Sequence, residues 1–175
     1  MVFSGCAGSN KTLARLQFAV SSLQVAIALG SNLGDRRAHL DWATERLGEF
    51  ISSLRVSTIT ETAPVDVPDD QPPYLNAVVV GETALEPDAL LEKLMALELE
   101  RGRERRSFRA ARTLDLDLIL YGQRIIKTPE IEIPHPRYRD REFVLRPLAE
   151  IAPDWIDPVT GRPVQTLLRE LTGRK

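Results

Sequence analysis

Cysteine is nearly absent from this sequence, with Cys6 the only one among 175 residues. A single cysteine excludes an internal disulfide and a cysteine-based zinc cluster. A chain of this length can bury a hydrophobic core without either device. The sequence therefore predicts a globular protein of a reducing compartment, which we take to be the cytoplasm.

Long apolar runs and an excess of either charge are also missing. The longest apolar stretches, such as VAIAL at 25–29 and AVVV at 77–80, are far shorter than the ~18 residues of a membrane-spanning helix. The formal net charge is −2, so the chain has no bulk attraction to nucleic acid or to anionic lipid. We therefore expect no membrane and no nucleic acid among its partners, and any work done by cations has to be local.

The order of the expected elements indicates the fold class. β-rich segments and segments with helical apolar spacing succeed one another. They are, in order, strand 23–32, helix 35–50, strand 54–62, strand 74–82, helix 87–101 and strand 113–121. This order is typical of an α+β fold with a ferredoxin-like core, in which helices pack on a mainly antiparallel sheet.

The two ends of the chain differ in pattern. Residues 1–21 lack periodic apolar positions, and we interpret them as an N-terminal extension, a flexible segment outside the fold. Short helices are expected near 141–149 and 163–171, and the four prolines of residues 64–73 predict a loop. Residues 22–175 are therefore expected to form one domain.

A pair of aspartates interrupts the most apolar of the expected strands, RTLDLDLILYG at 112–122. Residues i and i+2 of a strand share a face, so Asp115 and Asp117 lie side by side while the leucines between them face the other way. Adjacent carboxylates repel, and a divalent cation such as Mg²⁺, held together with substrate phosphates, relieves the repulsion. The alternative for so short a motif is a solvated strand face balanced by arginines.

Arginines gather directly before these aspartates. Six of them fall within residues 101–112: Arg101, Arg103, Arg105, Arg106, Arg109 and Arg112. The planar guanidinium suits phosphate oxygens, although an arginine run by itself is more often a solvated loop. Beside paired carboxylates, the run indicates chemistry on a di- or triphosphate.

Further candidates lie elsewhere in the chain. Glu98 borders the apolar stripe of its helix, where it makes either a helix-end ion pair or a substrate contact. His135 stands between two prolines in a loop near more arginines. Tyr74, Asn76 and Phe143 would suit a flat heteroaromatic ligand, with core packing as the alternative for each aromatic.

Five segments, taken in order, carry a resemblance to one enzyme family. They are ALGSNLGDR at 28–36, QPPYLNAVV at 71–79, ELERGRERR at 98–106, RTLDLDLILYG at 112–122 and PHPRYRDREFVLRPLAEIAP at 134–153. From about Val25 to the C-terminal end, the chain is similar to 6-hydroxymethyl-7,8-dihydropterin pyrophosphokinases. The resemblance implies a folate-pathway enzyme that transfers pyrophosphate from ATP to 6-hydroxymethyl-7,8-dihydropterin and releases AMP.

The resemblance also implies roles for individual residues. Two Mg²⁺ ions would be held with ATP by Asp115 and Asp117, while Arg103 and Arg112 would act as catalytic residues that stabilise the transferring phosphates. The pterin would be bound by Tyr74 and Phe143, which sandwich its ring, and by Asn76 and the backbone near Thr62, which read its edge. The residues that would bind ATP are Glu98, Arg105, Arg112, His135 and Arg141.

Departures and rivals complete the expectations. The chain has Arg109-Ala110-Ala111 where many family members have Trp-Gly-Pro or Asn-Ala-Pro, so the loop that closes over the substrates is expected to differ. One rival is another Mg²⁺-dependent, nucleotide-using transferase on the same fold. The other is a nucleic-acid binder that uses the arginine run, against which the acidic net charge argues. We expect the protein to act as a monomer.

Overall fold

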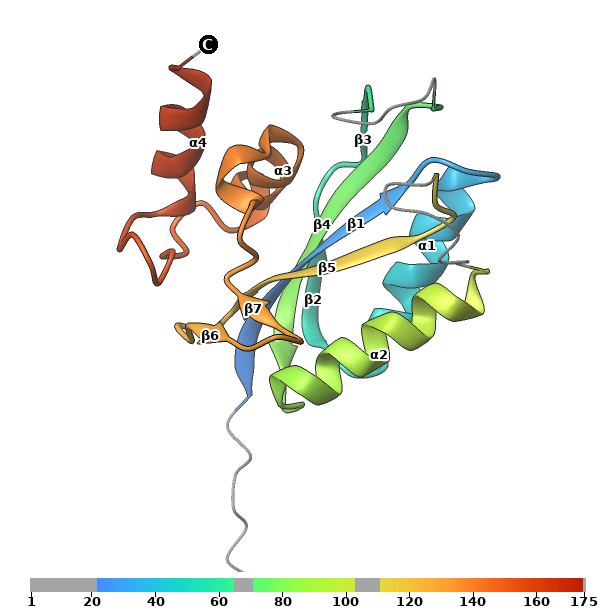
Figure 1. The fold of residues 1–175 in the computed structure, drawn as a ribbon, viewed down its shortest axis with the longest axis horizontal. Coiled ribbons are helices and arrows are strands. Elements are labelled where there is room, and N and C mark those ends of the chain that lie inside the picture. The colour runs from blue at the N-terminus through green and yellow to red at the C-terminus, as the bar shows by residue number, and fades with distance from the viewer. Residues whose placement is uncertain (1–21, 65–70, 103–110, 175) are drawn as a thin grey trace, which may run out of the picture.

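The computed structural model describes residues 22–64, 71–102 and 111–174, so the expected extension 1–21 lies outside the described residues. The elements follow one another in a simple order (Figure 1). They are β1 (Leu23–Ser31), α1 (Arg36–Leu47), β2 (Ser52–Val56), β3 (Thr60–Thr62), β4 (Tyr74–Thr83), α2 (Pro87–Glu100), β5 (Asp115–Tyr121), β6 (Ile126–Lys127), β7 (Glu132–Ile133), the 3-10 helix η1 (Tyr138–Asp140), α3 (Glu142–Ile151) and α4 (Val164–Thr172). None of the helices in these ranges is long and apolar enough to cross a membrane.

Five strands form an antiparallel sheet in the order β2-β4-β1-β5, with β3 paired to β4 beyond the end of β2, and β6 and β7 form a separate two-stranded sheet. Helices α1 and α2 cover one face of this sheet, and α3 and α4 lie on the other (Figure 1). The central position of the first strand, between the third and fourth main strands of the chain, is the ferredoxin-like arrangement. The predicted α+β fold is therefore confirmed.

Alternation along β1 divides the molecule into two cores. Val25, Ile27 and Leu29 pack with the α1–α2 side, whereas Ala26 and Ala28 face the α3–α4 side. Successive strand side chains point to opposite faces, so a strand with both faces covered carries apolar residues at nearly every position. β1 thus has large side chains on the α1–α2 face and small ones on the α3–α4 face.

The helices on the first face begin where local signals place them. The Asp35 side chain accepts a hydrogen bond of 3.0 Å from the Ala38 N–H and caps α1. Pro87 occupies the first turn of α2, where its missing N–H costs nothing. Leu40 and Leu47 of α1 and Leu94 of α2 are buried against the sheet. Both predicted helices are confirmed, and so are the two short C-terminal ones.

The prediction of a single strand over 54–62 is wrong, because the structure has two strands there, β2 and β3. Ser57, between them, donates its backbone N–H to Val78 O and accepts the Val78 N–H with its side-chain hydroxyl, both at 2.9 Å. The hydroxyl takes the place of a strand carbonyl and ends the ladder. The next residue, Thr58, turns to Glu150 of α3 with its N–H and its hydroxyl, each at 2.9 Å.

An irregularity in β5 prepares the functional site. Ala26 and Ile27 of β1 pair with Leu120 and Leu118, so Ile119 is an extra residue on β5. Such a bulge leaves a backbone group outside the ladder and re-aims the strand. The Ile119 carbonyl accepts a hydrogen bond of 3.0 Å from the His135 N–H. The bulge therefore fastens the segment after β7 to the strand that carries the two aspartates.

Candidate active site

Polar side chains form a floor on the sheet face toward α3. Asp115 pairs with Gly30, Asp117 pairs with Ala28, and Gly30 pairs on its other side with Asn76. Residues paired across antiparallel strands share a face, so Asp115, Gly30 and Asn76 make one row across three strands. A Cβ atom on Gly30 would lie 3.6 Å from Asn76 Oδ1 and 3.8 Å from Asp115 Cβ. The absence of a side chain at Gly30 keeps the space above this row open.

A cavity of about 570 Å³ lies above the floor, and the segment 135–144 and Leu171 of α4 contribute the rest of its lining. Its size is typical of small-molecule sites. The cavity brings together most of the predicted site residues: Thr62, Tyr74, Asn76, Arg112, Asp115, Asp117, His135, Arg141 and Phe143. Predicted residues from four separate stretches of the sequence thus meet at one place.

The two aspartates have different basic neighbours. Arg112 Nη1 lies 2.6 Å from Asp115 Oδ1, while Arg141 Nη1 and His135 Nε2 lie 3.5 and 3.8 Å from Asp117 Oδ2. Burial, and next to it the charge of Asp115, raises the pKa of Asp117. The floor therefore combines two mutually repelling carboxylates with surrounding cations, an arrangement that additional positive charge would stabilise.

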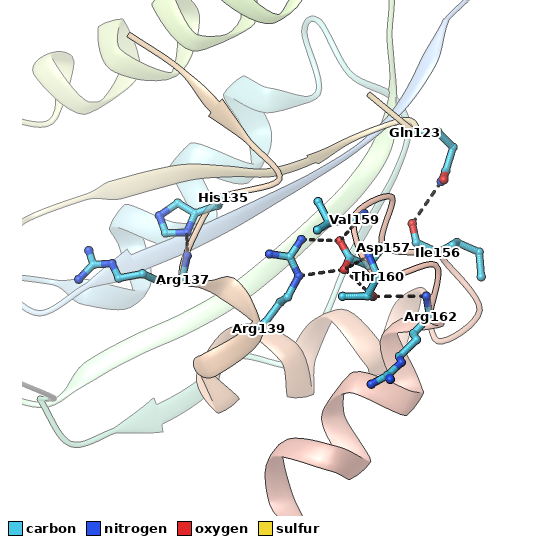
Figure 2. A network of polar contacts seen from close by, with 9 residues as sticks. All are labelled: Gln123, His135, Arg137, Arg139, Ile156, Asp157, Val159, Thr160 and Arg162. Atoms are coloured by element: carbon cyan, nitrogen blue, oxygen red, sulfur yellow. Dashed lines mark hydrogen bonds and ion pairs between the residues drawn. The ribbon is translucent and has the colours of Figure 1, made fainter. Parts of the chain in front are cut away.

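His135 presents a defined edge to the cavity. The Arg137 N–H donates to His135 Nδ1 at 3.2 Å (Figure 2). The proton of the neutral ring therefore belongs on Nε2, which lies 3.8 Å from Asp117 Oδ2. Burial lowers the pKa of His135, and the Arg141 and Arg137 charges act in the same direction, against the opposing charge of Asp117. The neutral ring then offers an Nε2–H donor to an acceptor in the cavity.

Other residues of the same cavity suit a flat ring. Tyr74 and Phe143 both contribute to its lining, and the Asn76 amide donates to Thr62 Oγ1 at 2.8 Å. With its N–H group directed at Thr62, the amide presents Oδ1 above Gly30 as an acceptor. Burial raises the pKa of Tyr74, which keeps the phenol neutral. Tyr74, Phe143 and Asn76 thus offer a ligand aromatic surface and an oriented amide.

Asn32 holds the base of the site, and the sequence analysis did not single it out although it lies in the GSN stretch. The side chain is 1% exposed. Its Oδ1 accepts the Arg112 N–H at 2.7 Å, and its Nδ2 donates to Gln71 Oε1 at 3.2 Å. The backbone N–H of Asn32 also donates to Arg112 O at 3.0 Å. Arg112 is therefore positioned by both its backbone and its contact with Asp115.

Glu98 does not line the cavity. Its side chain is 4% exposed, on the α2 side of the sheet, and Oε1 accepts the Leu116 N–H at 2.8 Å. Leu116 stands between the two aspartates, so Glu98 fixes their strand from the opposite face. Arg103 and Arg105 lie outside the described residues.

The cavity also contains residues that sequence reasoning missed. Besides Gly30, these include Arg137, Asp140, Glu142 and Leu171. The alternating charges of RYRDRE could have indicated Arg137, Asp140 and Glu142, because each lies within two positions of a predicted site residue. Leu171 has no such signal, since an apolar residue in an amphipathic helix reads as core.

The donor set bears on the kind of metal that could bind. Within the described ranges, no group of three or more His, Cys, Asp or Glu side chains could hold a metal ion by itself. Asp115 and Asp117 offer hard oxygen donors on one face. Mg²⁺ commonly binds through one or two carboxylates and completes its coordination with waters and substrate phosphates. The pair therefore fits Mg²⁺ that binds together with a nucleotide.

Comparison with known proteins agrees with this geometry. The sequence pattern of the family described as 7,8-dihydro-6-hydroxymethylpterin-pyrophosphokinase (HPPK) matches residues 26–153. The chain is 40% identical over 147 residues to the 2-amino-4-hydroxy-6-hydroxymethyldihydropteridine pyrophosphokinase of Synechocystis sp., which covers 83% of this chain and 74% of that protein. It is 41% identical over 148 residues to the protein of the same description from Pseudomonas aeruginosa, covering 83% and 90%.

Longer proteins contain a similar region. The chain is 36% identical over 167 residues to the folic acid synthesis protein fol1 of Pneumocystis carinii, covering 95% of this chain and 22% of that protein. The crystal structure of Plasmodium falciparum HPPK-DHPS wild type with pteroate superposes with a TM-score of 0.70 at 13% identity. That match covers 88% of this chain and 43% of the other, and at this identity it supports the fold alone.

Proposed function

The chain belongs to the 7,8-dihydro-6-hydroxymethylpterin-pyrophosphokinase family and is a pyrophosphokinase of folate biosynthesis. On this premise we propose that it transfers the pyrophosphoryl group of ATP to the hydroxymethyl group of 6-hydroxymethyl-7,8-dihydropterin. The hydroxymethyl oxygen forms a bond to the β-phosphorus, the bond from that phosphorus to the α,β-bridging oxygen breaks, AMP leaves and the hydroxyl proton is released.

One observation carries the proposal: a single cavity combines the two kinds of surface that the two substrates need. Tyr74, Phe143 and the oriented Asn76 amide supply the first kind, and the paired carboxylates among cations supply the second. Transfer between two substrates depends on holding the reacting atoms together, because proximity alone removes much of the barrier.

Asp115 and Asp117 would hold Mg²⁺, two ions bound with ATP. Bound Mg²⁺ supplies positive charge that neutralises the phosphate oxygens as they react. The two carboxylates share one face of the sheet. Their partners on β1, Ala28 and Gly30, carry no side chain larger than a methyl group. Their rigid strand, fixed by Glu98 at Leu116, keeps both donors in position.

The cations of the cavity would bind the phosphates. Burial lowers the pKa of Arg141, and the nearby Arg137 charge adds to this effect, so a bound anion would stabilise the charged Arg141 guanidinium. Arg112 would contact the transferring group, and His135 would donate its Nε2–H to a phosphate oxygen. Arg103 and Arg105 are proposed for the same work on the basis of the family resemblance.

Tyr74 and Phe143 would stack on the two faces of the pterin ring. Asn76 Oδ1 would accept from the amino edge of the pterin, since its amide N–H group is engaged by Thr62. Stacking contributes ~0.5–1.5 kcal/mol beyond the buried area. Arg141 Cζ lies 5.6 Å from the centre of the Phe143 ring, so a residue proposed to bind the pterin lies beside one proposed to bind the phosphates.

The test of the proposed function is product analysis with a matched pair of variants. We expect AMP to form from ATP only when the hydroxymethyl dihydropterin is supplied; ADP as the product would favour the rival nucleotide-using transferase. Phe143→Ala should weaken pterin binding by at least about tenfold and leave nucleotide affinity nearly unchanged. Phe50→Ala removes a half-buried aromatic from the other core and serves as the control. Wild-type pterin affinity in Phe143→Ala would contradict the stacking role.

Three further expectations remain proposals. Residues 22–175 are proposed as the single catalytic domain, so deletion of residues 1–21 should leave activity and melting temperature nearly unchanged. The protein is proposed to act as a cytoplasmic monomer. Binding to nucleic acid, if it occurred through the arginine run, would fall steeply with salt, and a titration at two salt concentrations separates this rival.

A further inference from the structure

The segment 135–141 has two faces. His135, Arg137 and Arg141 contribute to the cavity lining, and we call them the cavity face. Tyr138 and Arg139, which we call the anchor face, are directed away from the cavity: Tyr138 is fully buried in the α3–α4 core. Figure 2 shows Arg139 reaching toward Asp157 while Arg137 extends away from it. What fixes the anchor face therefore determines where the cavity face lies.

Arg139 is fixed by a buried carboxylate from the loop between α3 and α4. Its Nε lies 2.8 Å from Asp157 Oδ2 and its Nη2 lies 2.6 Å from Asp157 Oδ1. Asp157 is 0% exposed and does not contribute to the cavity lining. A bidentate pair fixes both the position and the rotation of the guanidinium, which a single contact does not.

The loop holds the carboxylate rigidly. The Thr160 N–H and hydroxyl donate to Asp157 Oδ2 at 3.1 and 2.6 Å, and the Asp157 N–H donates to Arg162 O at 2.9 Å. Although burial acts in the opposite direction, the hydrogen bonds from Arg139 and Thr160 lower the pKa of Asp157 to about 2. The carboxylate is therefore ionised at any pH at which the enzyme would be assayed.

Regular secondary structure restrains the segment mainly at its C-terminal end, where the Arg141 carbonyl accepts the N–H groups of Val144 and Leu145 of α3, both at 3.0 Å. Between β7 and α3 the chain has only the three residues of η1, and its backbone contact with the sheet is the bond from His135 N–H to Ile119 O. Arg137 and Arg141 each lie two residues from Arg139. Movement of Arg139 would displace both guanidiniums relative to the aspartates on β5.

We propose that Asp157 is a positioning residue of the active site, which acts through Arg139 to hold the cavity face at its working distance from Asp115 and Asp117. The proposal rests on the proposed function, in which the cavity face binds the phosphates of ATP. It predicts that loss of the Asp157 charge impairs nucleotide binding although no atom of Asp157 reaches the cavity.

The experiment compares Asp157→Asn with Arg162→Gln in the full chain. Asparagine keeps the volume of Asp157 and removes its charge. Arg162 lies on the same loop, but its side chain pairs with Glu170 of α4 at 2.7 Å and does not touch η1, so it is the matched control. We expect Asp157→Asn to raise the KM for ATP by about tenfold, with little change in the dissociation constant of the pterin. Arg162→Gln should leave both at the wild-type value.

Measurements are made well below the melting temperature of each variant, and pterin affinity reports that the site is folded. Arg139→Lys retains the charge without the bidentate fork and should show an intermediate KM for ATP. Equal losses of ATP and pterin affinity, or a lower melting temperature with an unchanged KM for ATP, would overturn the positioning role.

Arg141→Ala separates this proposal from the one on which it rests. If Arg141→Ala raises the KM for ATP and Asp157→Asn does not, only the positioning role of Asp157 is wrong. If Arg141→Ala leaves the KM for ATP unchanged, the assignment of the cavity face to the nucleotide is wrong, and the positioning role falls with it.

Discussion

The two faces of the sheet use the same strands for opposite purposes. Toward α1 and α2, Val25, Ile27 and Leu29 fill the space between sheet and helices. Toward α3, the alternate positions carry Ala28 and Gly30, and the space that larger side chains would have filled is part of a cavity. One face contributes burial of apolar area, and the other gives up part of that burial to admit substrates.

The faces also differ in what joins them to their helices. Apolar contacts and the hydrogen bond from the Leu116 N–H to Glu98 hold α1 and α2, whereas the α3–α4 side adds a bidentate ion pair between Arg139 of η1 and the buried Asp157. Packing is non-directional, and a bidentate ion pair fixes angles as well as distances. The comparison teaches that this molecule places directional contacts where side chains must be aimed at a ligand.

The largest expected effect is on activity and comes from the two aspartates of β5. Asp115→Asn or Asp117→Asn should lower kcat by about 10²–10³-fold, because each removes charge from a proposed metal ligand. Stability should stay equal or rise, since burial and mutual repulsion disfavour the charged form of Asp117. Steady-state kinetics with Mg²⁺ and thermal melts check both. Asp41→Asn, in an exposed pair on α1, is the control; near-full activity in both site variants would refute the metal assignment.

On the opposite face the expected effect is on stability alone. Ile27→Ala removes buried methylenes from a fully enclosed position and should cost about 3 kcal/mol of the free energy of unfolding. At a temperature where the variant is folded, kcat/KM should remain near wild type. Urea denaturation measures the first quantity and a standard assay the second, with Ile125→Ala, which is exposed, as the control. A large loss of kcat/KM without loss of stability would mean that the two faces are not independent.

The two faces should differ in how the stability of their variants depends on pH. Because the pKa of Asp157 is about 2 in the folded chain and below its usual value, the ionised carboxylate stabilises the native state above about pH 4. This stabilisation, roughly 2 kcal/mol, is lost as the pH falls through the folded pKa. The stability difference between wild type and Asp157→Asn should therefore vanish between about pH 4 and pH 2. The deficit of Ile27→Ala should stay constant over the same range, and a parallel decline in both would argue against an electrostatic origin.

The smallest effect expected here is that of filling the cavity from its floor. Gly30→Val should weaken pterin binding by about tenfold, because its methyl groups would extend beyond the Cβ position toward Asn76, Asp115 and Tyr74. The Cβ itself meets these neighbours at 3.6–3.8 Å, an ordinary contact distance, so Gly30→Ala should be milder in binding and nearly neutral in stability. Fluorescence titration with a pterin analogue ranks the three proteins. Equal affinity in all three would show that the pterin does not lie over this row.

Most of the fold could be predicted, because its information is local. Period-two alternation in β1 and β5, and helical spacing after Asp35 and Pro87, identify the main elements and their order. The break at Ser57 could not be predicted, since it depends on a serine hydroxyl reaching Val78 on another strand. The two-residue strands β6 and β7 are too short to show any periodicity.

The candidate site was predictable to the extent that it lies in contiguous motifs. Asp115, Asp117, Tyr74 and Asn76 stand in strands, where alternation states which side chains share a face. Glu98 shows the limit of such reasoning: its place beside an apolar stripe left open a substrate contact or an ion pair, and the structure gives it the Leu116 N–H. The alternatives differ only in what lies across the sheet, which spacing along one helix does not encode.

The sequence by itself determined that two carboxylates share one face of a buried strand, because the side-chain period of a strand is two. It also determined the order of elements, because each element's apolar pattern matches its own geometry. Only the tertiary structure decided which cations face those carboxylates. Arg141 and His135 reach Asp117 because the Ile119 bulge and the buried Asp157 hold the segment 135–141 in place. Such contacts join residues far apart in the chain, and their distances follow from sheet register and helix packing, which local periodicity does not specify.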